Sequence, residues 1–292
     1  MNFKDTFFSP KLTITCHGRL IDFSVPRVMG ILNVTPDSFY DGGRHTNEAA
    51  MILKVASMMG EGADIIDVGA FSTRPGATEI TADEEKARLL GALQIIRREF
   101  PDICISVDTF RADIAEMAVE DFGAGIINDI SAGNMDDRML ATAGRLKVPY
   151  IMMHMLGTPG KMPSKPVYAD VTRDLMAYFA DRVAAAKLLG IIDIILDPGF
   201  GFGKSLEHNY SLLTGLEAFQ ILELPLMVGI SRKSMIYKAL ETDSEHSLHG
   251  TTAAHMAALL KGASLLRVHD VQAAVETVKI FQQIVNSPGH DV

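Results

Sequence analysis

Two kinds of segment alternate along this chain: short runs that are almost wholly apolar, and longer segments that are apolar on one side only. In the longer segments apolar residues recur three or four positions apart, as in a helix with one buried face. Between residues 47 and 60, for example, Ala49, Ile52 and Ala56 fall on one stripe. The short runs are typical of strands that are buried on both faces of a sheet. The alternation therefore predicts strands and helices that follow one another along most of the chain.

The short runs occupy residues 28–33, 64–68, 103–108, 125–129, 149–154, 192–196, 226–231 and 263–269. Helical patterns follow them near residues 47–60, 81–100, 112–122, 138–146, 171–189, 209–219, 234–240 (continued at 251–261) and 271–285. Eight strands that alternate with eight helical segments predict an α/β fold, a (β/α)8 TIM barrel. A doubly wound open sheet stays an alternative, because periodicity cannot show whether a sheet closes.

Residues 12–25 break this pattern, because they alternate apolar and polar positions around His17 and Gly18. Such alternation predicts a small hairpin ahead of the barrel. The expected organisation is an N-terminal extension with this hairpin (1–27), a barrel domain (28–286) and a flexible tail (287–292).

Composition narrows the class of protein. A hydrophobic fraction of 48% permits a large core, and a formal net charge of -9 leaves no basic surface for nucleic acid or an anionic membrane. Cys16 and Cys104 are too few for a disulfide framework, so both are expected to be reduced thiols. No apolar run reaches the length of a membrane span, and residues 1–10 lack the apolar core of a secretion signal. We expect a cytoplasmic protein.

Polar residues gather at the carboxyl ends of the predicted strands. They are Asn33, Asp67, Asp108, Asn128, His154, Asp197, Ser231, Arg267 and His269. In a barrel these ends meet at one mouth, where active sites of this fold lie. Packing alone does not require so many polar groups there, although His154 could equally well only cap its strand.

The sixth run leads into a glycine-rich segment that begins at Asp197 and ends at Lys204. Pro198 stands where a P-loop requires glycine, and Lys204 stands where a dinucleotide fingerprint requires its last glycine. Bare glycine backbone would let a flat ligand approach closely, with Phe200 or Phe202 against its ring. A purely structural turn is the alternative interpretation.

The candidate residues form two chemical groups. Asp108, Asn128, Asp197 and Lys233 offer donors and acceptors suited to the edge of a flat heterocycle, and a carboxylate can accept two parallel bonds from a guanidine-like edge. Arg267, His269 and Asn33 suit an anion such as phosphate together with Mg2+, which keeps several waters and few protein ligands.

At this point a family resemblance can be stated. It is carried by segments 33–43 (NVTPDSFYDGG), 72–77 (STRPGA), 106–109 (SVDT), 128–130 (NDI), 197–204 (DPGFGFGK), 231–234 (SRKS) and 267–270 (RVHD). These motifs, in this order, resemble those of the dihydropteroate synthase family, and the match spans roughly residues 28–286.

The resemblance implies an activity and roles for the residues. The reaction would join 6-hydroxymethyl-7,8-dihydropterin diphosphate to para-aminobenzoate, giving 7,8-dihydropteroate and diphosphate. By the resemblance, the pterin would be held by Asp108, Asn128, Asp197 and Lys233, the metal Mg2+ by Asn33, and the diphosphate by Arg267, His269 and Thr73. The aminobenzoate site would be shaped by Phe39, Thr73, Arg74, Pro75, Phe202 and Ser231. The family also implies competition by sulfonamides and a homodimer formed through a late helix.

Lys233, Arg267 and His269 are the residues that we expect to act in catalysis, with Lys233 mainly positioning the pterin. Three other functions stay open. A related barrel passes a methyl group from methyltetrahydrofolate to a corrinoid, but the Arg267–His269 pair and the Asn33 segment argue against it. A Schiff-base aldolase would use Lys233 as nucleophile. The third alternative is a non-catalytic pterin-binding or scaffold barrel, which would show no turnover.

Overall fold

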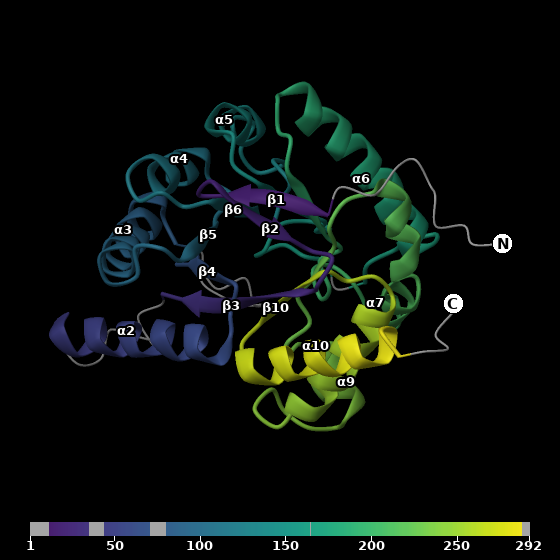
Figure 1. The fold of residues 1–292 in the computed structure, drawn as a ribbon. Helices are drawn as coiled ribbons and strands as arrows, with labels where there is room; N and C mark the ends of the chain where they lie inside the picture. The colour runs from purple at the N-terminus through teal and green to yellow at the C-terminus, as the bar shows by residue number, and fades with distance from the viewer. Residues whose placement is uncertain (1–11, 35–43, 71–79, 164, 288–292) are drawn as a thin grey trace.

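The structure is a computed structural model that describes residues 12–34, 44–70, 80–163 and 165–287. Within this part of the chain, parallel strands form an eight-stranded sheet surrounded by helices (Figure 1). The order of the strands across the sheet is β8-β7-β6-β5-β4-β3-β10-β9. Their bounds are β3 (Arg27–Asn33), β4 (Ile65–Gly69), β5 (Cys104–Asp108), β6 (Ile126–Asp129), β7 (Tyr150–Met153), β8 (Ile194–Asp197), β9 (Met227–Val228) and β10 (Leu265–Val268).

The sheet closes on itself, which the sequence could not show. An isolated parallel bridge joins Leu196 to Leu226, and the amide of Leu196 donates to Pro225 O at 2.9 Å. These contacts link β8 to the segment that leads into β9, the two edges of the sheet. The prediction of a TIM barrel is confirmed, and the open doubly wound sheet is excluded.

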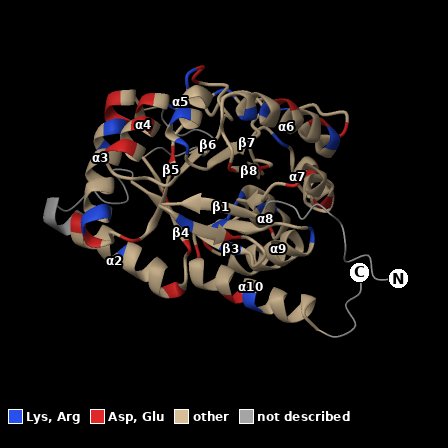
Figure 2. Cartoon of the chain, turned by 45° about the horizontal axis from the view of Figure 1, so that its top comes forward, with Lys and Arg blue, Asp and Glu red and all other residues tan. Residues whose placement is uncertain are grey.

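Helices cover the outside of the barrel. They are α2 (Arg44–Glu61), α3 (Ala82–Glu99), α4 (Ala112–Glu120), α5 (Met139–Leu146), α6 (Val171–Leu188), α7 (Leu206–Thr214), the 3-10 helix η1 (Leu216–Leu222), α8 (Ser234–Ala239), α9 (Leu248–Leu260) and α10 (Val271–Val285). Thr81 caps α3, since its hydroxyl accepts from the amide of Glu84 at 3.2 Å. Lys/Arg and Asp/Glu alternate over the outer helices, so charges of both signs are interspersed there (Figure 2). None of the helices in the described part of the chain is both long and apolar enough to span a bilayer.

One strand starts later than its apolar run suggested. Ile192 was expected to open the sixth strand, but β8 begins at Ile194 and the side chain of Ile192 is 72% exposed. The strand itself is buried throughout, as predicted. Hydropathy alone could not separate a buried isoleucine from an exposed one in the turn that precedes the strand.

The predicted hairpin lies across one end of the barrel (Figure 1). It consists of β1 (Thr13–Cys16) and β2 (Arg19–Asp22), joined by His17 and Gly18, which both have positive φ (50° and 70°). Two such residues are what a tight two-residue hairpin turn needs. Buried residues of the hairpin pack against the lower layer of the barrel interior: Ile14, Cys16 and Phe23 meet Met29, Ile65, Ile126, Ile151, Ile195, Met227 and Leu265. The hairpin thus plugs the end opposite to the carboxyl ends of the strands.

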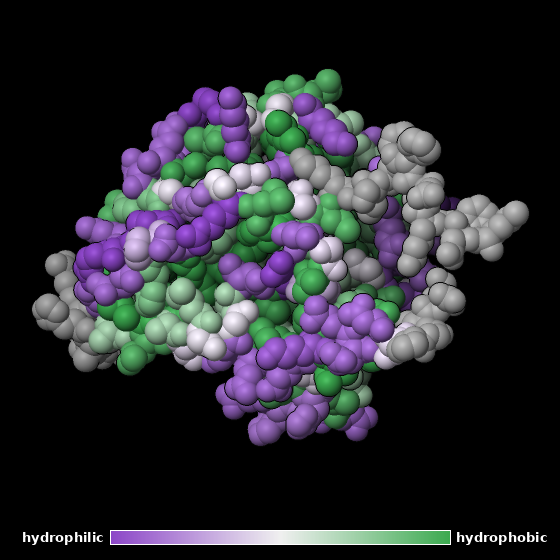
Figure 3. All heavy atoms as spheres, in the orientation of Figure 1, coloured by the Kyte–Doolittle hydropathy of each residue, from purple (hydrophilic) through white to green (hydrophobic). Residues whose placement is uncertain are grey.

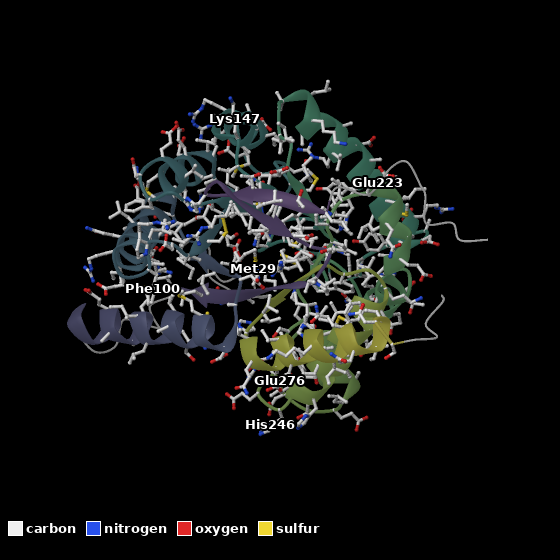
Figure 4. All side chains as sticks on the ribbon, viewed as in Figure 1. Met29, Phe100, Lys147, Glu223, His246 and Glu276 are labelled. Atoms are coloured by element: carbon white, nitrogen blue, oxygen red, sulfur yellow. A yellow bond between two sulfur atoms is a disulfide. The ribbon has the colours of Figure 1, made fainter. Side chains whose placement is uncertain are left out.

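Figure 4 shows the contrast between this interior and the periphery, because Met29 lies at the centre of the barrel whereas Lys147, His246 and Glu276 lie at its edge.

The expectation of two reduced thiols is wrong. Cys16 and Cys104 are joined by a disulfide between the end of β1 and the start of β5. The expectation failed because it considered only number and composition. Packing of the hairpin beneath β5 brings together two cysteines that are 88 residues apart in sequence.

Candidate active site

The strand register places the polar residues side by side at the mouth. Asn33 pairs with Gly69, Gly69 with Asp108, and Asp108 with Asn128, so three polar side chains occupy one level on neighbouring strands. Gly69 between them keeps room for Asp108, because a Cβ at Gly69 would lie 3.2 Å from the Cβ of Asp108. The predicted convergence of strand ends is confirmed for these residues.

Arg267, from β10, reaches across this mouth to two carboxylates. Its Nε donates to Oδ2 of Asp67 at 2.6 Å, and its Nη2 donates to Oδ2 of Asp108 at 2.6 Å. The amide of Asn128 donates to the same oxygen of Asp67 at 3.1 Å. Arg267 was predicted to bind an anion. Its guanidinium instead contacts Asp108, one of the residues predicted to bind the heterocycle.

Asp67 is the site residue whose chemical role was not predicted from the sequence. It is fully buried in the middle of β4, and its Oδ1 has no hydrogen-bond partner among the described residues. The signal that could have found it was a charged residue inside a run that is otherwise wholly apolar, since such a charge is costly to bury without a partner.

The acidic residues of the mouth are held in an environment that disfavours their charge. Burial raises the pKa of Asp108 to about 7, although Arg267 opposes this rise. Burial also raises the pKa of Asp197, against the opposing effect of Lys233 and of the Gly199 amide. Burial works against the charge of Arg267 too, but the adjacent Asp67 and Asp108 carboxylates hold its pKa above the usual value. Several charges thus share one poorly solvated site, as is typical of active sites.

Lys233 lies just before α8, and its ammonium group points to the glycine-rich segment. Its Nζ donates to Phe200 O at 2.7 Å and lies 4.6 Å from the centre of the Phe202 ring, a cation–π contact. Burial lowers the pKa of Lys233 to about 8, while Asp197 opposes the change. The predicted proximity of Lys233, Asp197 and Phe202 is thus confirmed by the structure.

Apolar side chains form a wall beside the polar residues. Phe202 is buried against Ile130 and Met153, and Phe110, Met155 and Met162 pack around them. An aromatic and thioether surface next to a row of carboxylates suits a flat ring with a polar edge. The wall explains how a heterocycle could be held on its face as well as on its edge.

Ser231 and His269 lie on neighbouring segments of the rim. The hydroxyl of Ser231 accepts a hydrogen bond from the backbone amide of His269 at 3.2 Å, which fixes the two residues relative to each other. The remaining predicted residues, Thr73 and Arg74, with Phe39 and Pro75, lie outside the described residues.

Asn33 is the residue predicted to hold a metal. Its side chain is half-buried, and it forms no hydrogen bond with the other described residues. Within residues 12–34, 44–70, 80–163 and 165–287, no group of three or more His, Cys, Asp or Glu is arranged to hold a metal. A single neutral oxygen, next to the residues predicted for a diphosphate, suits the chemistry of Mg2+, which takes most of its ligands from water and from substrate phosphates.

A cavity of about 320 Å3 lies at the other end of the barrel, against the hairpin and the disulfide. Its charged groups are paired with one another: Arg27 with Asp64 at 3.1 Å, and Arg19 with Asp102 at 3.3 Å. Figure 3, seen from the hairpin side, shows polar and apolar residues mixed over this face.

Comparison with known proteins agrees with this geometry. Residues 29–269 match the family described as pterin binding enzyme, and the chain belongs to this family. Within it, the chain is similar to dihydropteroate synthases. The enzyme of that name from Escherichia coli (strain K12) is 41% identical over 278 residues, which cover 94% of this chain and 98% of that one.

Two solved structures extend the similarity to three dimensions. A Yersinia pestis dihydropteroate synthase in complex with a sulfonamide drug has a TM-score of 0.87 and 39% identity, over 94% of this chain and all of that one. A Xanthomonas albilineans dihydropteroate synthase with 4-aminobenzoic acid has a TM-score of 0.86 and 39% identity, over 96% of this chain and all of that one.

Proposed function

We infer that this protein catalyses the dihydropteroate synthase reaction of folate biosynthesis. It condenses 6-hydroxymethyl-7,8-dihydropterin diphosphate with para-aminobenzoate and releases diphosphate. The observation that carries this function is the set of polar groups at the mouth: the buried Asn128 and Asp197 and the half-buried Asp108 lie beside the Phe202 wall. Its similarity to dihydropteroate synthases extends over nearly the whole chain.

In the proposed complex, Asp108 and Asp197 accept hydrogen bonds from the amino and ring N–H groups of the pterin. Asn128 would add a donor and an acceptor, and Lys233 would donate to a ring atom from beside Phe202. Arg267, between Asp67 and Asp108, would be shared by the pterin edge and the diphosphate. These contacts orient the methylene carbon, which is the reacting atom.

The reaction breaks the bond between the methylene carbon and the diphosphate oxygen, and it forms a bond from that carbon to the arylamine nitrogen. The amine is neutral near pH 7, so it needs no strong base, and its proton leaves for solvent or diphosphate. Because the electron-rich pterin tolerates positive charge on the methylene, we propose a dissociative displacement. The guanidinium of Arg267 and the imidazole of His269, as hydrogen-bond donors, would stabilise the charge that develops on the leaving diphosphate.

We also propose that Asn33 holds Mg2+ through its amide oxygen. When bound, the ion would offset negative charge on the diphosphate. The support is the position of Asn33 at the rim and its unpaired amide among the described residues. A metal-free preparation should lose diphosphate release, and added Mg2+ should restore it.

Two further properties belong to this proposal. We place the protein in the cytoplasm as a homodimer. A late helix, α10, is the proposed contact, and its support is that Ile280 is 58% exposed and Val285 is 38% exposed. Light scattering would give the mass in solution, and the variant Ile280→Asp should shift it toward the monomer.

The Cys16–Cys104 disulfide is unusual for a cytoplasmic protein, so thiol titration of freshly purified protein would test that location.

Sulfonamides should compete at the aminobenzoate site, which the proposal assigns to Phe202 and Ser231 with Thr73 and Arg74. The support is that the Yersinia pestis relative was solved with a sulfonamide drug. Competition would be seen as a rise in KM for para-aminobenzoate without a change in kcat.

The decisive experiment is an assay of diphosphate release with both substrates, with each one alone, and with and without Mg2+. Release that requires both substrates is expected of the synthase. Methyl transfer to a corrinoid, or trapping of a carbonyl substrate on Lys233 by borohydride, would instead support one of the alternatives.

A further inference from the structure

Lys204 is a buried lysine that the proposed chemistry does not use. It ends the glycine-rich segment after β8, and its side chain turns inward beneath that segment. Its Nζ donates to Gly199 O at 2.8 Å, to Phe202 O at 3.3 Å and to His154 O at 3.4 Å, and it lies 3.0 Å from Nδ1 of His154. The ammonium group is thus surrounded by three carbonyl oxygens and one imidazole nitrogen.

This arrangement fixes the state of His154. Burial lowers the pKa of Lys204 to about 7, while Asp197 opposes this change. When Lys204 carries its proton it can only donate, and Nδ1 of His154 is then the acceptor. Burial, together with the nearby Lys204 charge, lowers the pKa of His154 to about 3, so the ring is neutral at physiological pH. The ring is also held edge-on against Tyr178, with ring centres 4.8 Å apart. His154 therefore serves as a fixed acceptor for Lys204.

The segment above Lys204 is pressed onto the end of β7. Gly199 and Gly203 both have positive φ (69° and 64°). A Cβ at Gly199 would lie 2.0 Å from His154 O, and one at Gly203 would lie 2.6 Å from Leu156 O. No side chain fits at either position, so the contact is between one backbone and another. Tyr168 adds a hydrogen bond from its hydroxyl to Gly203 O at 3.0 Å.

The same segment carries groups that face the proposed substrate. Phe202 contributes its ring to the apolar wall, while its carbonyl is the one that Lys204 holds. Lys233 contacts the other side of the segment through Phe200 O and the Phe202 ring. The Lys204 charge also acts on Asp197 at the start of the segment, where it favours the ionised carboxylate.

We propose that Lys204, with neutral His154 as its acceptor, is a positioning residue that clamps segment 199–203 onto β7 and so holds Phe202 and Asp197 in place for the pterin. This inference rests on the proposed function of the site. Lys204 does not touch the substrate itself, because the segment lies between them. Its role is to donate to the carbonyl groups of His154 and Phe202 and to add a second donor to Gly199 O, which also accepts from the amide of Phe202 at 3.1 Å. These hydrogen bonds keep the segment in a single conformation.

The first test replaces Lys204 by methionine, which keeps the length of the side chain but removes the donors. Without these donors the buried carbonyl groups lose hydrogen bonds and the segment is held less firmly, so we expect kcat/KM for the pterin diphosphate to fall about 10- to 100-fold. The loss should lie mainly in KM for the pterin diphosphate, and amide hydrogen exchange at residues 199–203 should become faster. The matched control is Lys187→Met, at an exposed lysine of α6, which should change neither quantity.

The second test acts on the acceptor. His154→Asn keeps an acceptor close to the position of Nδ1, whereas His154→Phe keeps a ring against Tyr178 but removes the acceptor. We expect His154→Phe to raise KM for the pterin diphosphate about tenfold and His154→Asn to restore most of the loss. This pair decides the question if Lys204→Met does not fold.

The outcomes separate this inference from the proposed function. If the wild type releases diphosphate, and if Lys204→Met and His154→Phe both keep wild-type KM and wild-type exchange at 199–203, the clamp is wrong while the function stands. If the wild type releases none, the function is wrong. Exchange at 199–203, with calorimetry of 6-hydroxymethylpterin binding to each variant, then still decides whether Lys204 holds the segment.

Discussion

Arg232 and Asp270 form a two-point ion pair at the rim of the barrel, with Nε to Oδ2 at 2.7 Å and Nη2 to Oδ1 at 2.6 Å. Arg232 directly precedes Lys233, and Asp270 directly follows His269. Arg232 has a φ of 55°, in the left-handed region, and its amide donates to Oγ1 of Thr251 at 3.2 Å. The pair therefore ties together the two segments that carry predicted catalytic residues and holds Arg232 in a costly backbone conformation.

Breaking this pair should disturb activity more than stability. Because both side chains are partly exposed, we expect Arg232→Ala to cost about 1 kcal/mol of unfolding free energy and about tenfold in kcat/KM. Arg232→Gly is the control, since glycine accepts the positive φ but also lacks the guanidinium. If Arg232→Gly had wild-type activity, backbone strain rather than the ion pair would be the reason for any loss in Arg232→Ala.

Asp197 should be an anchor for the pterin. Asp197→Ala would leave pterin donors buried without an acceptor, and we expect a loss of about 2–4 kcal/mol in transition-state binding. Steady-state kinetics with both substrates would measure this loss as a fall in kcat/KM. Near-normal catalytic efficiency in Asp197→Ala would refute the role assigned to Asp197.

Asp67 should matter through Arg267 and Asn128. Asp67→Asn preserves the shape of the side chain and one acceptor oxygen but removes the charge that faces Arg267. Asp67→Ala removes the acceptor as well as the charge. We expect a loss of about 1–3 kcal/mol in unfolding free energy for Asp67→Asn and a larger one for Asp67→Ala. Urea unfolding would show the order, and equal stabilities of all three proteins would contradict it.

The ionisation of Asp108 should control the pH dependence of activity. Its pKa is raised to about 7, so the carboxylate that accepts from the pterin is lost as the pH falls below that value. Stability should respond in the opposite sense. Between the ordinary pKa of 3.8 and about 7, the folded state binds this proton more tightly than the unfolded state, so Asp108 favours folding increasingly as the pH falls.

A profile of kcat/KM against pH, recorded with an unfolding curve at each pH, would separate these two effects. We expect activity to fall below pH 7 while the protein stays folded. In Asp108→Asn, activity should be low and this acidic limb should be absent. An unchanged limb in that variant would assign the titration to another group.

The disulfide between Cys16 and Cys104 should stabilise the protein without serving catalysis. It closes a long loop, and loops of this kind contribute about 2–4 kcal/mol. Cys104→Ser, or wild type in reductant, should therefore unfold at a lower urea concentration, while kcat stays the same because the site is at the other end of the barrel. A reductant should have no effect on the stability of Cys104→Ser.

The alternation of apolar runs and amphipathic segments was sufficient to predict the barrel. Each run is a local signal, and strands such as β3 and β5 lie within a residue of their predicted positions. The placement of Asn33, Asp108 and Asn128 at strand ends also predicted that they would meet, since the carboxyl ends of parallel strands share one mouth. The motifs, in turn, were specific enough to predict the family.

Pairings across the barrel were decided only by the tertiary structure. The contact between Arg267 and Asp67 joins residues 200 positions apart, and Lys204 meets His154 across 50 positions. Neither pairing can be predicted from hydrophobic periodicity, because these contacts depend on how the sheet closes and on the direction in which each side chain points. For the same reason the two cysteines could be counted but not paired. Sequence thus determined which groups reach the mouth, and closure of the barrel determined which of them bind one another.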